Sequence, residues 1–174
     1  MQLDGAGDSA ALTLAFTVVL EAQQCGEPAA WITAQPSVFY PPDAYHSGVD
    51  LAALPVVRAA GVTAAFSAAD LLLRSGAFGL LVADLGVPPA VPSTALARLA
   101  GLARRHATAL VLLTRAASSA SGGSLGSLIS MHARAERRHL GRDRFCCGLV
   151  AVKDKSRAPA WRHTELHHGA AGLR

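Results

Sequence analysis

Short apolar runs alternate with longer amphipathic segments along most of this 174-residue chain, and this alternation constrains the fold more than any other feature. Each run is bounded by Gly, Pro or a charged residue, which is typical of strands buried on both faces. The expected strands are Ala29 to Thr33, Leu54 to Val57, Leu80 to Ala83 and Ala109 to Leu113. Helical spacing predicts helices from Ser9 to Gln24, from Thr63 to Ser75 and from Pro92 to Arg105.

The end of the chain has a different pattern. Polar and apolar residues alternate from Met131 to Ala135, from Phe145 to Val152 and from Arg162 to His168, which predicts antiparallel strands. Helices and buried strands in this order predict a single α/β domain, with a mostly parallel sheet between helix layers and an antiparallel C-terminal edge. A hydrophobic content of 51% is sufficient for a substantial core.

A segment from Gly5 to Leu12 lies where a phosphate-binding loop, G-x-x-x-x-G-K-[ST], would join the first strand to the first helix. Only its first glycine, Gly5, is present. Ala10 replaces the second glycine, Ala11 the lysine that would reach the phosphates, and Leu12 the hydroxyl that would hold Mg²⁺. The phosphates of a nucleotide would therefore meet apolar groups. A glycine-rich turn before an ordinary helix is the alternative interpretation.

Beyond this loop, the chain resembles the RecA recombinase core over nearly its whole length. The most specific stretch is Ala69 to Phe78 followed by Leu80 to Asp84, which is similar to that family's helix, turn and Walker B strand. The other similar segments are Thr13 to Gln23, Trp31 to Pro36, Gly48 to Asp50, Leu99 to Gly101, Ala109 to Thr114, Gly122 to Ser124, Arg137 to Arg138, and Val152 to Lys155 with Ala158 to Pro159. The resemblance implies a RecA-like three-layer core.

Three further positions indicate that the implied nucleotide site is degenerate. Gln35 stands where the family has its catalytic glutamate, and an amide cannot accept a proton near neutral pH. Arg115 replaces the glutamine that senses the γ-phosphate. Asp84 matches the Walker B aspartate, and either binds Mg²⁺ weakly or caps the turn after its strand. The resemblance thus implies a pseudo-ATPase with no catalytic residue, no cofactor and no metal.

DNA binding is expected to be weak or absent. The two loops that match the DNA-binding loops of the family, Leu85 to Pro92 and Ala116 to Ser121, contain no aromatic or basic residue. Residues 134 to 174 carry ten Lys and Arg against four Asp and Glu, so any residual binding should come from there. A solvated basic face is the alternative.

Both lysines of the chain, Lys153 and Lys155, lie in one short segment, whereas arginine occurs fourteen times. The matching lysines of the RecA filament reach the nucleotide of the neighbouring subunit. Lysine and arginine are not interchangeable at a phosphate, so the resemblance implies a partner-binding edge here. A solvated pair at a β-turn is the alternative.

Other candidate groups favour structural interpretations. His163, Glu165 and His167 should share one strand face, where a polar edge strand is favoured over a metal cluster. Aromatic residues between Gln35 and His46 suggest a loop with a contact surface. The cysteines Cys25, Cys146 and Cys147 lack C-x-x-C spacing and should be reduced thiols.

These features together resemble the ImuA proteins of bacterial mutagenesis operons. The resemblance implies a cytoplasmic, non-catalytic accessory of the SOS response that binds RecA and modulates its filament, together with a translesion polymerase complex. No stretch is apolar enough to predict a membrane span. The alternatives are a cell-division inhibitor similar to SulA and a weak residual nucleotide-binding protein.

Overall fold

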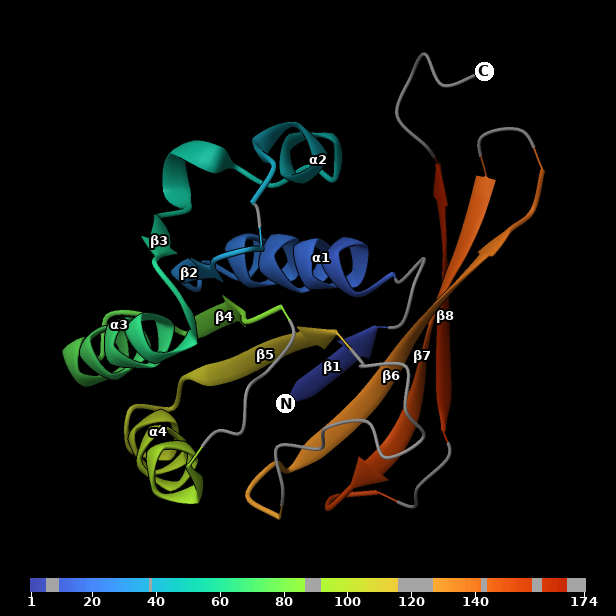
Figure 1. Cartoon of the computed structure of the whole chain (residues 1–174). Coiled ribbons are helices and arrows are strands. Elements are labelled where there is room, and N and C mark those ends of the chain that lie inside the picture. The colour runs from blue at the N-terminus through green and yellow to red at the C-terminus, as the bar shows by residue number, and fades with distance from the viewer. Residues whose placement is uncertain are drawn as a thin grey trace.

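The computed structural model of the chain describes residues 1–5, 10–37, 39–86, 92–115, 127–141, 144–157 and 161–168. Within them, eight strands form one sheet with helices on both faces (Figure 1). The strands are β1 (Gln2–Gly5), β2 (Ala29–Ala34), β3 (Val56–Ala59), β4 (Leu80–Asp84), β5 (Ala109–Arg115), β6 (Met131–His139), β7 (Arg144–Asp154) and β8 (Arg162–His168). The helices are α1 (Ala11–Gln24), α2 (Pro41–His46), α3 (Val62–Ser75), α4 (Ser93–Arg105) and the short 3₁₀ helix η1 (Leu51–Ala53).

The strand order is β3-β2-β4-β5-β1-β6-β7-β8. All neighbours from β3 to β6 are parallel, and β7 and β8 add two antiparallel pairings. The predicted fold class, an α/β fold with a mostly parallel sheet and an antiparallel C-terminal edge, is therefore confirmed. Because helices cover both faces of its centre, every residue of β2 and β4 is buried, as their continuous apolar sequences predict.

Two separate cores hold the three layers together. On the face of α1 and α2, the aromatic rings of Phe16, Trp31 and Phe39 pack with centroids 5.1 to 5.9 Å apart. On the face of α3 and α4, Leu73 and Leu99 pack with apolar side chains of the central strands. Rings at these distances contribute stability beyond the area that they bury.

One predicted strand was misplaced. Residues Leu54 to Val57 were expected to form it, but β3 begins at Val56. Leu54 is buried among the residues under α1 and α2, and the carbonyl of Pro55 accepts a hydrogen bond from the Trp31 amide at 3.0 Å. Since proline has no N–H to donate, regular pairing starts after it.

The predicted aromatic loop between Gln35 and His46 is partly wrong, because residues 41–46 form α2. Phe39 belongs to the aromatic core, whereas Tyr40 and Tyr45 are 58% and 70% exposed. A contact surface there remains a prediction, which the exposed Tyr40 and Tyr45 support.

None of the helices in the described ranges is long and apolar enough to cross a bilayer. Cys25, Cys146 and Cys147 are all unbridged, as predicted. Cys147 is buried beside α1, and this burial raises the pKa of its thiol.

Candidate functional site

The carboxyl ends of the parallel strands bring the predicted nucleotide-site residues to one edge of the sheet, here called the carboxyl edge. Gly5 ends β1, Asp84 ends β4, Arg115 ends β5, and Gln35 follows β2. Gly5 lies opposite Arg115 in register, and the Arg115 amide donates to the Gly86 carbonyl at 2.7 Å. In parallel α/β sheets, ligands bind beyond this edge.

The first turn of α1 is packed against the sheet. Ala10 is fully buried and Ala11 is 7% exposed, and both contact a cluster that contains Leu14, Ala135 and Cys147. Leu12 is 37% exposed. Residues 6–9 of the loop lie outside the described residues. The positions that would hold the second glycine and the lysine of a phosphate loop are thus part of an apolar cluster between α1, β6 and β7.

Asp84 is held by hydrogen bonds from its own chain. The residue is 4% exposed, and its carboxylate Oδ2 accepts a hydrogen bond from Ser37 Oγ at 2.5 Å. Oδ1 accepts from the Gly86 amide at 3.2 Å, which is the turn-capping contact that the sequence left open. Both oxygens therefore have protein donors. No group of three or more His, Cys, Asp or Glu in the described part of the chain is placed to hold a metal ion.

Ser37 is a residue of this edge that sequence reasoning missed. It lies beyond the Gln35-Pro36 turn, and its carbonyl accepts a hydrogen bond from the Thr33 hydroxyl at 3.2 Å. Thr33 and Ser37 help to line a cavity of about 350 Å³, which Gln35 and Arg58 also border. The dipeptide Gln-Pro predicts a turn, but no sequence signal places Ser37 against β4.

The two loops predicted to be too short for DNA binding are largely outside the described residues. Of the first, Leu85, Gly86 and Pro92 are described; Leu85 and Gly86 are buried, and Pro92 is exposed at the start of α4. The second, residues 116–121, is not described. The prediction about these loops therefore remains open.

Lys153 and Lys155 lie at the opposite, amino edge of the sheet, where β7 ends. In register, Lys153 faces His132 and Asp154 faces Met131, at the start of β6. The segment 153–157 is called the lysine turn below. Lys155 is exposed, and its Nζ donates to the Ser127 carbonyl at 2.6 Å, whereas Lys153 is half-buried.

Asp154 organises the lysine turn. Its Oδ1 accepts from the amides of Ser156 at 2.8 Å and Arg157 at 3.2 Å, and its Oδ2 accepts from Trp161 Nε1 at 2.8 Å. The hydrogen bond from the Ser156 amide, followed by that from Trp161, holds the pKa of Asp154 below its usual value. The turn that presents Lys155 is thus fixed by a carboxylate that stays ionised.

One face of the antiparallel strands is rich in arginine. The opposite face packs on α1 through Ala135 and Cys147, so strand alternation and register place the even-numbered residues from 134 to 138, from 144 to 150 and from 162 to 168 on the open side. This arginine face consists of the exposed side chains Arg134, Arg138, Arg144 and Arg162. Within residues 134–138, 144–150 and 162–168, the acidic residue of this face is Glu136, which lies 3.8 Å from Arg162.

His163, Glu165 and His167 share one face of β8, as predicted. The Glu165 carboxylate lies 2.7 Å from His163 Nε2 and 3.1 Å from His167 Nε2, and it also accepts from the Thr17 hydroxyl at 3.4 Å. Burial raises the pKa of Glu165, but the hydrogen bonds from the two histidines outweigh it and hold that pKa below its usual value. The group joins β8 to α1, which favours the structural interpretation.

A comparison of the chain with models of known protein families found no match, and neither did a comparison with curated protein sequences.

Proposed function

We propose that this protein is a non-catalytic RecA-like accessory of the SOS response in the bacterial cytoplasm. It binds RecA through the lysine turn and caps or destabilises the RecA filament, in concert with a translesion polymerase complex. Among known families, this proposal assigns to the chain a role like that of the ImuA proteins.

The observation that carries the proposal is the contrast between the two edges of the sheet. Head-to-tail filaments need two different surfaces on each subunit, one for each neighbour. At the amino edge, the lysine turn presents the exposed Lys155. At the carboxyl edge, Ala11 is buried and the Asp84 carboxylate is bonded within the chain. A subunit with one usable edge would end a filament.

The arrangement of the strands supports the RecA-like part of the proposal. The stretch with the most specific resemblance, Ala69 to Asp84, runs through α3, a turn and β4 in the order that the resemblance implies. Three residues of the implied nucleotide site lie at the ends of adjacent strands: Asp84 ends β4, Arg115 ends β5 and Gly5 ends β1. The degenerate loop supports the absence of ATP hydrolysis, since the side chains of Ala11 and Leu12 can bind neither phosphate nor metal.

The test is binding to nucleotide-loaded RecA by a variant with both Lys153→Ala and Lys155→Ala. Each lysine is expected to make a charge-assisted contact with phosphate, worth roughly 1.5 to 3 kcal/mol, so the affinity should fall by at least about tenfold. The matched control is Arg157→Ala, which removes an exposed cation from the same turn. Thermal melts of all variants separate a loss of binding from a loss of folding.

Two results would contradict the proposal. Equal binding by the double alanine variant would move the interface elsewhere, with the exposed Tyr40 and Tyr45 as the next surface to test. Binding that does not depend on the nucleotide in RecA would exclude a phosphate contact. A variant with arginine at both positions tests whether the compact ammonium is required.

A further inference from the structure

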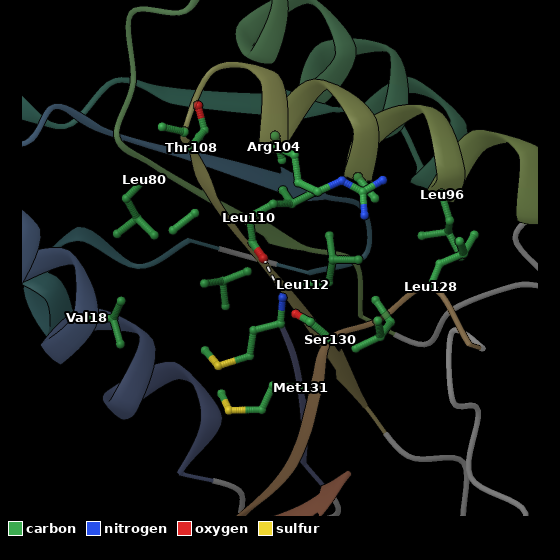
Figure 2. A pocket seen from close by; sticks show the side chains of 17 residues that line it. Val18, Leu80, Leu96, Arg104, Thr108, Leu110, Leu112, Leu128, Ser130 and Met131 are labelled. Atoms are coloured by element: carbon green, nitrogen blue, oxygen red, sulfur yellow. Dashed lines mark hydrogen bonds between the residues drawn. The ribbon is translucent and has the colours of Figure 1, made fainter. Parts of the chain in front are cut away.

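An apolar pocket of about 650 Å³ opens at the amino edge of the sheet, between α4, β5 and the start of β6 (Figure 2). Leu96 of α4, Leu110 and Leu112 of β5, and Leu128 and Met131 are among the side chains that surround it. Leu128 is 38% exposed. Removing the apolar surface of an open pocket from water is favourable, and pockets of this size bind ligands or the side chains of partners.

The charge at this pocket is positive. Arg104 is the one charged side chain among its lining residues, all of which belong to the described ranges, and it points from α4 toward the pocket (Figure 2). Arg104 is exposed, and it makes no ion pair with any other described residue. An unpaired guanidinium beside apolar surface favours an anionic group on whatever binds there.

The pocket adjoins the lysine turn through one short segment. The carbonyls of Ser127 and Ser130 accept hydrogen bonds from Lys155, through its Nζ at 2.6 Å and its amide at 3.0 Å. Leu128 and Ser130, from this same segment, line the pocket. Two cations, Arg104 and Lys155, are thus held next to the same apolar cavity by different elements of the fold.

Polar groups that would orient a small polar molecule are few. The Thr108 hydroxyl in the lining already donates to the Phe78 carbonyl at 2.8 Å. Small-molecule sites usually combine an apolar lining with several converging polar groups. The apolar lining and the basic surroundings fit an amphipathic peptide better, since such a segment inserts apolar anchors and keeps its charges at the rim.

We propose that this pocket binds an amphipathic, acidic segment of a partner protein, whose leucine-like side chains enter the cavity while its carboxylates pair with Arg104 and Lys155. The inference goes beyond the proposed function, because it does not require the partner to be RecA. The partner would then contact the amino edge through apolar side chains in the pocket, in addition to any contact with the lysines.

The probe is a short fluorescent peptide of leucine, alanine and glutamate, with the leucines at helical spacing. A second peptide, with lysine in place of each glutamate, tests the sign of the charge. The acidic peptide should bind to the protein and the basic peptide should not. Binding is measured by fluorescence anisotropy at two salt concentrations, because the ionic part should weaken with salt.

Two substitutions in α4 locate the site, each with a control in the same helix. Ala100→Phe should fill the pocket and abolish peptide binding, whereas Ala97→Phe, at an exposed position outside the lining, should not. Arg104→Glu should weaken binding by about tenfold, whereas Arg105→Glu should change it by less than about twofold. Thermal melts exclude a loss of folding in each variant.

Three results would overturn the inference. Unchanged peptide binding by Ala100→Phe would place the peptide elsewhere. Dodecanoate binding more tightly than the peptide would identify a site for a small amphiphile. Concentration-dependent dimers that Ala100→Phe abolishes, measured by sedimentation, would identify a second copy of this chain as the occupant.

Discussion

The two edges of one sheet differ in what they leave for other molecules. At the carboxyl edge, the Asp84 carboxylate accepts hydrogen bonds within the chain and Ala11 lies in an apolar cluster. At the amino edge, Arg104 and Lys155 are exposed beside an apolar pocket. In this fold, residues at the usual ligand edge of an α/β sheet contribute internal contacts, whereas the opposite edge leaves cations and apolar side chains exposed.

The largest effect expected from this contrast follows restoration of the missing lysine. Ala11→Lys places an ammonium in the cluster with Ala135 and Cys147, so it should lower the free energy of unfolding by about 3 kcal/mol. Leu12→Thr is the control, since its exposed position should change stability by less than about 1 kcal/mol. Urea denaturation measures both variants.

ATP provides the second readout of the same variants. We expect it to leave the melting temperature of the wild type and of both variants unchanged. A stable Ala11→Lys protein that melts higher in ATP would mean that the carboxyl edge is still a nucleotide site lacking one residue.

The second prediction concerns the buried carboxylate. Asp84→Ala leaves the Ser37 hydroxyl and the Gly86 amide without their acceptor, so it should destabilise the protein by about 2 kcal/mol. Asp84→Asn keeps an acceptor oxygen and should destabilise it less. Binding to RecA should be unaffected in both variants.

A phosphate-release assay separates this structural role from a catalytic one. Release from ATP should stay at background in the wild type and in both Asp84 variants. Turnover in the wild type that Asp84→Ala abolishes would show a working active site.

The parallel core could be predicted from sequence because its signals are local. Val62–Ser75 and Ser93–Arg105 show helical spacing, and Leu80–Asp84 is a continuous apolar run that ends in a charge. Strand alternation alone also predicted the bounds of Arg162–His168. In each case, the spacing of apolar residues that are close in sequence predicts which side chains the fold buries.

The features that escaped prediction depend on contacts between distant residues. Ser37 meets Asp84 across 47 positions, and Ala11 packs against residues of β6 and β7. The pocket beside Arg104 combines α4 with a segment that starts at Leu128. Local periodicity cannot show which side chains meet across a sheet. The sequence therefore predicted that the site residues lie along one edge, but not that Asp84 and Ala11 make contacts within the chain there.

A third, smaller effect would extend the comparison to nucleic acid. We expect weak, sequence-independent binding of single-stranded DNA to the arginine face. Replacing Arg134 and Arg138 together by alanine should weaken binding severalfold and lower the slope of log K against log salt by about 1.4, since each contact with a single strand contributes about 0.7.

The control for this prediction is a double alanine variant at Arg58 and Arg105, exposed arginines outside the arginine face. Its salt slope should match that of the wild type. Tight binding that persists at high salt would instead indicate recognition by stacking or base contacts.

The smallest effect expected is a pH dependence at the lysine turn. The folded-state pKa of Asp154 lies below its unfolded value, chiefly because of the Ser156 amide and then Trp161. Its stabilising contribution is therefore complete above the unfolded pKa, near 3.8, and is lost as the pH falls through the lower folded value. The difference in unfolding free energy between the wild type and Asp154→Asn should be greatest near neutral pH and should shrink on acidification. Trp161→Phe removes one of the donors, so in that background the same difference should be smaller at every pH. A difference that grows toward acid pH would mean that folding raises this pKa, and the lysine turn would then lack the ionised carboxylate that fixes it.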